Sequence, residues 1–450
     1  MEAEQPIFTG RQLRALIVPL VLEQILGLTV GMADSIMVSS AGETAVSGVS
    51  LVDSINILLV NTFASVSTGG AVVAAHRLGE KKREAANKTA DQLLMCVTGI
   101  ALFVTALSLF FNRPILKLIF GSVEESVMNN AVIYFYMTAL SFPFLGIYNA
   151  SAALSRAMGN SGITMRISVL MNVVNIAGNG FLVIGLGWGV FGAALSTLIS
   201  RALGSLVMYH VLRDDRHPLS FGRKPFVRPD WKILKNIMRI GIPTGLDNCI
   251  FQVGKILVQS LIAGLGTVAI AANAIAGTVA GVAVIPASAM GIAMITVVGQ
   301  TLGAGDILQV RRYVRKMMGY SYLFMAILNA AIIVFAGHIT GFYQVSEETK
   351  ALAVQVMIFH SVCAVLLWPT GFSLPNALRA AMDATYTMAV SIFSMWVFRI
   401  GCSYLFTLVF QMGLIGIWAA MAVDWIFRSS CFVWRFHGQK WLKKGENPVN

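Results

Sequence analysis

Charged side chains are scarce in this chain. Asp, Glu, Lys and Arg make up 12% of the 450 residues, whereas apolar residues make up 56%. Soluble domains carry about 25% charged residues, and a soluble chain of this length would need several domains with polar surfaces. The shortage of charge therefore excludes an ordinary soluble protein and indicates an integral membrane protein.

Cysteine and histidine are also few, and neither is arranged for chemistry. The five cysteines lie in or beside apolar stretches, with no CxxC pair, so we expect neither a disulfide framework nor a zinc site. The six histidines form no HxxxH or HExxH pattern, and the apolar stretches hold no nucleophile–base pair. We therefore expect no enzyme activity and no cofactor.

The net charge of +12 could suggest a nucleic-acid partner. The basic residues, however, fall in short loops between apolar stretches and form neither an arginine-rich arm nor one basic face. No nucleic-acid binding is expected.

The apolar stretches are long enough to cross a bilayer, which takes about 20 residues. Twelve spans are predicted: 14–38, 46–74, 92–112, 127–152, 163–187, 190–211, 240–263, 269–299, 314–337, 350–376, 385–409 and 413–434. Because the number is even, both termini lie on the same side of the membrane.

The distribution of basic residues predicts which side that is. Loops 76–92, 211–240 and 301–316 and the C-terminal tail are rich in Lys and Arg, whereas the loops near Gly42, Gly187, Gly266 and Gln411 have none. The positive-inside rule places both termini in the cytoplasm. Residues 1–10 are polar and no cleavage site follows the first apolar stretch. We therefore expect a multi-pass protein of the cell (plasma or inner) membrane.

The two halves of the chain resemble each other at a nearly constant offset. Leu78-Gly79 matches Leu302-Gly303 and Gly42 matches Gly266, both 224 residues later, and Arg156-Ala157 matches Arg379-Ala380 after 223. Chance does not readily produce such pairs in order at one spacing. With six spans in each half, both halves enter the membrane in the same orientation.

The predicted fold is an all-α integral membrane protein, with twelve transmembrane helices in two parallel six-helix lobes related by a pseudo-twofold axis. The lobes are 1–212 and 240–450, and the charged, proline-containing segment 213–239 is the cytoplasmic linker. Transporters built in this way place the substrate path between the repeats and alternate access by rocking them. The duplication therefore favours a transporter.

Several motifs resemble the multidrug and toxic compound extrusion (MATE) family. The most specific is VGQTLGAGD at 298–306, accompanied by ADSIMV at 33–38, LRAAMD at 378–383, and GIW at 416–418 with DWIFR at 424–428. The resemblance covers nearly the whole chain. It implies a multidrug efflux antiporter that exports organic, often cationic amphipathic compounds in exchange for H⁺ or Na⁺, with Asp34 as the coupling aspartate.

Polar residues inside spans are costly and hence candidate functional groups. The predicted cation-coupling residues of the N-terminal half are Glu23, Asp34, Asp53, Asn175 and Asn179. Many relatives carry Asp where Asn179 stands; because an amide oxygen can bind Na⁺ but an amide takes up no proton, a Na⁺ site of Asp34, Asn175 and Asn179 is one expectation. Interhelical hydrogen bonding explains the asparagines equally well.

The seventh span has an unusual polar stripe. Together with two asparagines of the first half, it forms the predicted substrate cavity: Asn149, Asn172, Asn248, Gln252, Lys255 and Gln259. For Lys255, a structural pair with a carboxylate is as good an expectation as a role in transport. Arg399 is expected either to be structural or to pair with a carboxylate.

Two readings of the substrate remain open. Small organic compounds are the partners implied by the family, with membrane lipids around a monomer. The alternative is a lipid-linked oligosaccharide or lipid flippase of the same superfamily, which Lys255 favours and the VGQTLGAGD string opposes.

Overall fold

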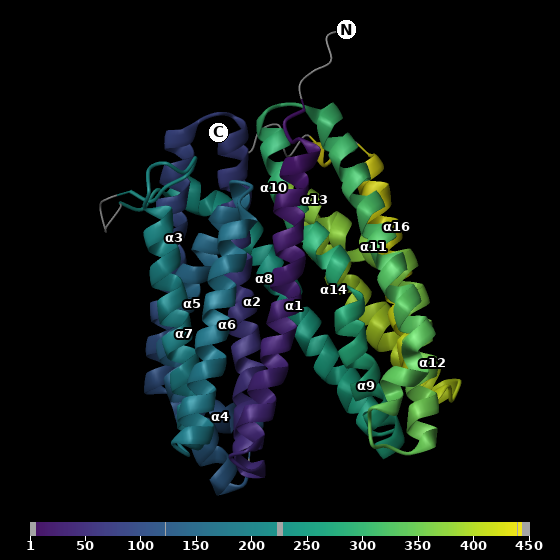
Figure 1. Ribbon diagram of the computed structural model, residues 1–450. Helices are drawn as coiled ribbons and strands as arrows, with labels where there is room; N and C mark the ends of the chain where they lie inside the picture. Colours follow the sequence, from purple (N-terminus) through teal and green to yellow (C-terminus); the bar gives the residue numbers. More distant parts are fainter. Residues whose placement is uncertain (1–5, 122, 223–227, 439, 443–450) are drawn as a thin grey trace. The chain divides into compact units, whose positions relative to one another are not determined.

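The protein is described by a computed structural model that covers residues 6–121, 123–222, 228–438 and 440–442. Every long regular element in this part of the chain is helical (Figure 1). In lipid, a helix satisfies its backbone hydrogen bonds internally, so long apolar stretches adopt this form. The predicted all-α class is confirmed.

The described chain divides into two compact units. The N-terminal unit is Thr9–Gly245, and the C-terminal unit comprises the described residues 6–8 and 246–442. The division falls within helix α8 (Trp231–Ala263). The segment expected as a linker, 213–239, therefore belongs to the N-terminal unit as far as it is described.

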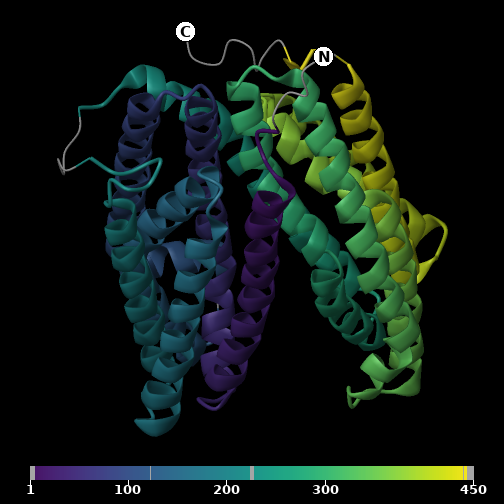
Figure 2. The same cartoon turned by 45° about the horizontal axis from the view of Figure 1, so that its top comes forward.

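The helices of the N-terminal unit are α1 (Gly10–Ser39), α2 (Glu43–Gly79), α3 (Arg83–Phe110), α4 (Asn112–Phe120), α5 (Glu125–Ala157), α6 (Ser161–Asn179), the π-helical η1 (Gly180–Gly185), α7 (Gly189–Leu212) and the first part of α8. Helix α5 packs against α2, α3 and α7, and α6 packs against α1 and α7 (Figure 2). Small residues permit this closeness: a Cβ at Gly48 would meet Asn130 and the backbone of α5.

The helices of the C-terminal unit are the rest of α8, α9 (Thr267–Ala283), α10 (Ile285–Gly303), α11 (Ile307–Gly341), α12 (Glu347–Trp368), η2 (Pro369–Ser373), α13 (Leu374–Ala380), α14 (Ala384–Ser394), η3 (Met395–Gly401), α15 (Cys402–Tyr404), η4 (Leu405–Val409) and α16 (Gly413–His437). Helix α12 packs against α9, α11 and α16, and apolar residues of these helices, with a few from α8 and α10, form a buried apolar core.

The expected span 269–299 is not one helix. It is divided into α9 and α10 at Val284, where Pro286 occupies the first turn of the second helix. Proline has no backbone N–H to donate, so it fits well at the start of a helix, where that N–H would have no partner within the helix. The stretch predicted as one span therefore consists of two helices.

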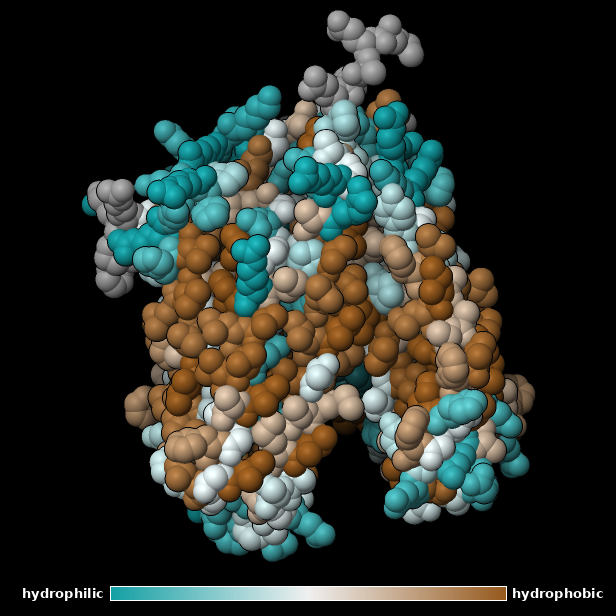
Figure 3. Space-filling view, viewed as in Figure 1, coloured by the Kyte–Doolittle hydropathy of each residue, from teal (hydrophilic) through white to brown (hydrophobic). Residues whose placement is uncertain are grey.

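Eleven helical stretches in the described residues are long and apolar enough to cross a membrane. Helix α8, at the place of the predicted seventh span, is 33 residues long but not among the eleven, since the polar stripe from Asn248 to Gln259 lowers its hydropathy. Apolar side chains cover the middle of the visible face of each unit, and hydrophilic ones gather toward its ends (Figure 3). The chain is a multi-pass membrane protein.

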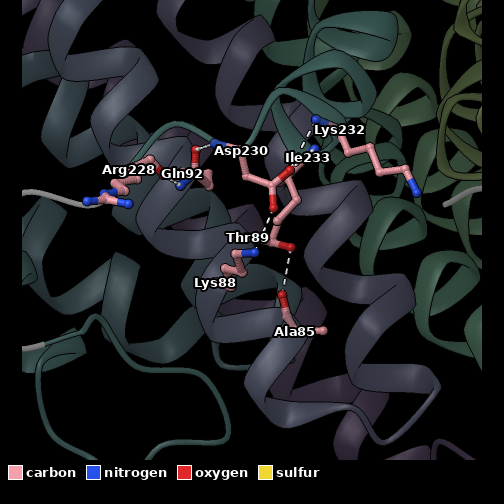
Figure 4. Close-up of polar contacts among 8 residues, drawn as sticks. All are labelled: Ala85, Lys88, Thr89, Gln92, Arg228, Asp230, Lys232 and Ile233. Atoms are coloured by element: carbon pink, nitrogen blue, oxygen red, sulfur yellow. Dashed lines mark hydrogen bonds and ion pairs between the residues drawn. The ribbon is translucent and has the colours of Figure 1, made fainter. Parts of the chain in front are cut away.

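The chain before α8 is fixed to α3 (Figure 4). The Gln92 side chain donates to the carbonyl of Arg228 at 2.8 Å and accepts the backbone N–H of Asp230 at 2.9 Å. The Lys88 ammonium lies 2.6 Å from the Asp230 carboxylate, which also accepts the N–H of Ile233 at 3.3 Å and so caps α8. The bonds from Lys88 and Ile233 lower the pKa of Asp230.

Backbone conformation repeats between the halves as the sequence does. Positive φ angles occur in five pairs separated by 223 or 224 residues: Gly42 and Gly266, Lys81 and Gly305, Gly159 and Met382, Gly187 and Gln411, Gly189 and Gly413. Each pair terminates or begins matching helices. The duplication predicted from the sequence therefore extends to the turns between helices.

Candidate functional site

The N-terminal unit contains a polar cavity of about 180 Å³. Its charged lining comes from three helices: Asp34 of α1, Asp53 of α2 and Arg201 of α7. Uncharged polar side chains also line it: Tyr134, Asn179, Ser35, Ser50 and Thr197. The cavity therefore joins two of the predicted coupling carboxylates with a cation on which the sequence analysis placed no role.

Asp34 is held by the end of α6. The side-chain amide of Asn179 donates to Asp34 Oδ1 at 2.7 Å, and also to Asn175 Oδ1 at 3.5 Å. Asn179 is the last residue before η1, and π-helical turns often occur at functional sites. The predicted grouping of Asp34, Asn175 and Asn179 is thus present in the structure.

Asn175 is fixed by α7. Its side-chain amide donates to Thr197 Oγ1 at 3.3 Å, and Ser196 donates to its backbone carbonyl at 2.8 Å. Ser196 and Thr197 of α7 can lie close to α6 because residue 178 is a glycine. A Cβ at Gly178 would meet the Ser196 side chain. The asparagine face therefore serves the packing of α6 on α7 as well as the cavity.

Asp53 and Arg201 are held independently. Asn56 donates to Asp53 at 3.3 Å, one helical turn away on α2, and Arg201 Nη1 donates to Ser141 of α5 at 2.8 Å. The described residues give Arg201 no direct ion pair within 4.0 Å, although it lines the same cavity as the two carboxylates. With both carboxylates ionised, the cavity carries a net charge of −1.

The donor set is suited to a small monovalent cation. Carboxylate and amide oxygens are hard ligands of the kind that alkali and alkaline-earth cations accept. The buried Oδ1 of Asn179 has no hydrogen-bond partner in the described residues, and buried polar atoms rarely stay unsatisfied. Among the described residues, no group of three His, Cys, Asp or Glu side chains could hold a metal ion by itself.

Glu23 lies apart from this cavity. Its carboxylate is 3.3 Å from Arg156 Nη1 and accepts from Thr164 Oγ1 at 3.1 Å. It therefore connects α1 to α5 and α6, and does not line the cavity of Asp34. The side-chain nitrogens of Asn149 and Asn172 are buried and have no hydrogen-bond partner among the described residues, and neither residue lines the cavity.

The C-terminal unit repeats the ion pair of Glu23. Asp247 lies 2.6 Å from Arg379, and both residues occupy positions equivalent to Glu23 and Arg156 in the duplicated sequence. Asn248 lies beside this pair in a small cavity of about 160 Å³. Asp247 and Arg379 are therefore a duplicated structural link between helices.

Lys255 and Gln259 line a larger cavity of about 390 Å³ in the C-terminal unit, whereas Gln252 does not. The described residues provide no carboxylate within ion-pair distance of Lys255, so the structural pair expected as one alternative is absent from them. Arg399 does pair with a carboxylate, as expected: its Nη1 lies 3.6 Å from Asp424.

Arg201 and Tyr134 were missed by the sequence analysis. Arginine in an apolar span is itself a signal of function, so the rule applied to the carboxylates would have found Arg201. Tyr134 carries no such signal, since an aromatic residue in a span has many packing roles. His360 and the tryptophans of the C-terminal cavity were missed for the same reason.

Comparisons with known proteins agree with this architecture. The MatE family model matches residues 19–182 and again 243–405, and the two matches begin at the offset of 224 residues seen within the sequence. A protein of Thermotoga maritima named as a probable multidrug resistance protein, NorM, is 26% identical over 443 residues, covering 96% of this chain and 93% of that protein. A Bacillus subtilis protein named as a probable multidrug resistance protein, YoeA, is 24% identical, covering 94% of each chain.

A solved structure shares the fold. It is described as the outward-facing conformation of a multidrug resistance MATE family transporter of the MOP superfamily, and it matches with a TM-score of 0.90 at 21% identity, covering 96% of each chain. The predicted two-repeat helical architecture is confirmed, and because the family consists of transporters, so is the expectation that the chain is not an enzyme. This chain belongs to the MatE family of membrane transporters.

Proposed function

We propose that the protein is a multidrug efflux antiporter, which exports organic and often cationic amphipathic compounds in exchange for H⁺ or Na⁺. The names of its relatives from Thermotoga maritima and Bacillus subtilis support multidrug resistance. The observation that carries the proposal is the N-terminal cavity, where Asp34, Asp53 and Arg201 face one space.

The charge of this cavity suits a single coupling cation. Asp34 and Asp53 with Arg201 give a net charge of −1, so one H⁺ or Na⁺ makes the cavity neutral. An uncompensated charge within the membrane is costly. Cation binding therefore favours a conformation in which the cavity is closed to water, and cation loss favours the open one.

The groups around Asp34 act on this equilibrium in different ways. Asn179 stabilises the empty, ionised carboxylate through its hydrogen bond of 2.7 Å. Its oxygen, which has no partner among the described residues, supplies ligands for Na⁺ together with Asn175. Arg201 competes with the entering cation for both carboxylates, so the cation is bound weakly enough to leave.

Transport then follows from alternating access between the two repeats. An external cation binds at Asp34, and its binding shifts the population of conformations toward release of the organic compound outward. The compound and the cation thereby affect each other's affinity reciprocally. Glu23 contributes by holding α1, the helix that carries Asp34, against α5 and α6.

The proposed location is the cell membrane, with both termini in the cytoplasm and a monomer as the working unit. The basic side chains at one end of the N-terminal unit support this orientation: Arg77, Lys82, Arg83 and Lys88 lie between or beside the ends of α2 and α3.

Efflux of a fluorescent organic cation from proteoliposomes tests the function. The protein should move the dye against its gradient when an inward H⁺ or Na⁺ gradient is imposed, and only the coupling ion should support this movement. Collapse of that gradient with an ionophore should stop efflux within the same trace. Dye movement that is the same with and without protein would reject the proposal.

The alternative is the flippase of lipid-linked oligosaccharides or lipids. Lys255, which has no ion pair in the described residues, favours it, because a cationic cavity suits a phosphate group. The two functions separate in one assay: a flippase would move a fluorescent lipid-linked pyrophosphate between leaflets and leave the organic cation where it is.

A further inference from the structure

The C-terminal unit holds a cavity whose charge is opposite to that of the N-terminal one. Lys255 and Arg399 line it, and none of the described carboxylates does. Asp424, which pairs with Arg399, is fully buried and does not line the cavity. From this asymmetry we infer that the cavity binds an aromatic organic anion. Export of that anion rests on the proposed function, whereas its binding does not.

The positive charge is not balanced by the surroundings. Asp424 is shared by two guanidinium groups, with Arg428 Nε at 2.8 Å and Arg399 Nη1 at 3.6 Å. Asp247, the neighbouring carboxylate on α8, is bound by Arg379 at 2.6 Å. Lys255, Arg399 and Arg428 carry three positive charges and Asp424 carries one negative charge. The net charge of these four side chains beside the cavity is therefore +2.

Lys255 is the cationic group that remains available to bind a ligand. It is exposed to the cavity, and the described residues hold no ion-pair partner for it. A lysine that must stay charged within a span needs a counter-charge. Since this part of the chain does not supply one, a ligand carboxylate, sulfonate or phosphate would.

The side chains that line the cavity indicate the shape of the apolar part of the ligand. The ring of His360 meets Trp418 and Trp425 edge-on, with centroids 5.4 and 5.6 Å apart. Trp368 and Phe372 are stacked at 4.8 Å on the same cavity. Aromatic rings pack favourably on such faces and edges, so a planar aromatic body fits better than an aliphatic chain.

The arginines hold this arrangement in place. The guanidinium of Arg399 lies over the ring of Phe251 at 5.6 Å, and that of Arg428 over Phe372 at 5.3 Å. Cation–π contacts of this kind fix the position of the ring as well as that of the charge. The volume of about 390 Å³ lies within the range of ligand pockets, about 300–1,000 Å³.

A matched pair of probes tests the charge preference. Equilibrium binding of 2-naphthalenesulfonate and of naphthyl-2-trimethylammonium to the full chain in uncharged detergent compares an anion and a cation of similar shape. The anion should bind at least about tenfold more tightly, the effect of one hydrogen bond to a charged group. Equal binding, or tighter binding of the cation, would overturn the inference.

Variants locate the site. Lys255→Gln should weaken binding of the sulfonate by about tenfold or more, whereas Lys255→Arg should retain it. Lys316→Gln is the control, because Lys316 lies outside the cavity against Tyr320. Unchanged sulfonate binding in Lys255→Gln, or displacement of the sulfonate by phosphatidylglycerol at equal concentration, would contradict a site for aromatic anions.

The outcome is separate from that of the proposed function. Asp34→Asn should lose ion-driven export yet still bind the sulfonate, because Asp34 does not line this cavity. If wild type binds the sulfonate but exports nothing under either ion gradient, the antiporter proposal fails and the binding site stands. If cationic dye is exported and the sulfonate does not bind, the inference fails and the antiporter stands.

Discussion

Asn179, the last residue of α6, donates its side-chain amide to Asp34 of α1 across 2.7 Å. The same side chain leaves its oxygen buried and without a partner in the described residues. It thus stabilises the ionised carboxylate with its nitrogen and offers an unused ligand with its oxygen.

Replacing Asn179 with Ala should change the concentration of coupling ion that half-saturates export by about tenfold or more, because hydrogen bonds to charged groups contribute about 1.5–3 kcal/mol. If the ion is H⁺, half-saturation should move to lower concentration, since the ionised carboxylate loses a donor. If it is Na⁺, half-saturation should move to higher concentration, since an oxygen ligand is lost.

Asn172→Ala is the matched control. Asn172 lies on the same helix, and its amide nitrogen has no hydrogen-bond partner in the described residues. If export depended on ion concentration in the same way in Asn179→Ala, Asn172→Ala and wild type, Asn179 would have no role in coupling.

Arg201 should set how readily the cation leaves. Arg201→Gln removes the positive charge that faces Asp34 and Asp53, so the coupling ion should bind more tightly and turnover should fall. Arg201→Lys keeps the charge and should retain most of the rate. Initial rates of dye efflux over a range of ion concentrations measure both effects, and equal ion affinity in Arg201→Gln and Arg201→Lys would speak against this role.

The fold was largely predictable because its signals are periodic and repeated. Span length, the placement of Lys and Arg and the offset of 224 residues each follow from the physics of the bilayer or from duplication. The split between α9 and α10 falls beside Pro286, and hydropathy does not register it. The start of α8 depends on the capping and ion-pair contacts of Asp230 with α3, and such contacts are not visible in the sequence alone.

The site was predictable only in part. Asp34, Asp53 and Asn179 do line one cavity, because polar residues in spans gather where they avoid lipid. Glu23 shares a helix face with Asp34, yet it pairs with Arg156 on α5. Helical spacing places residues on a face, but the partner is decided by the neighbouring helix.

Glu23 should prove to be a stabilising residue. Glu23→Gln removes the negative charge that pairs with Arg156, which should lower the free energy of unfolding by less than the about 3–5 kcal/mol of a fully buried pair, because both side chains are partly exposed. The double variant Glu23→Gln/Arg156→Gln should be less destabilised than the sum of the single ones. Thermal unfolding in detergent measures this coupling.

The duplicated pair provides the control. Asp247→Asn and Arg379→Gln should show the same coupling in the C-terminal unit, where the ion pair is 2.6 Å long. Additive effects in both pairs would show that neither ion pair stabilises the fold.

Asp230 should stabilise the start of α8 in a pH-dependent way. Its pKa is lowered in the folded protein by Lys88 and the N–H of Ile233. The stabilisation is therefore present above the unfolded pKa of about 3.9 and is lost as the pH falls through the lower folded value. Hydrogen exchange of the Lys232 and Ile233 amides, corrected for intrinsic rates, should show protection at pH 7 that declines below about pH 4.

Two variants separate the charge of Asp230 from its capping role. Asparagine also caps helices well, so Asp230→Asn should lose the pH dependence and keep most of the protection, whereas Asp230→Ala should lose about 1 kcal/mol of cap stabilisation as well. The same pH dependence in Asp230→Asn as in wild type would assign the effect to another group.

The coupling role of Asp34 is tested most directly by dye efflux from proteoliposomes under an imposed H⁺ or Na⁺ gradient, compared between wild type, Asp34→Asn and Asp306→Asn. Asp306 caps α11 by accepting the N–H of Gln309 at 2.8 Å, a role that asparagine also fills, so this variant should export like wild type. Asp34→Asn should reach the membrane folded and show no gradient-driven export. Full export by Asp34→Asn would contradict the assignment of the coupling site.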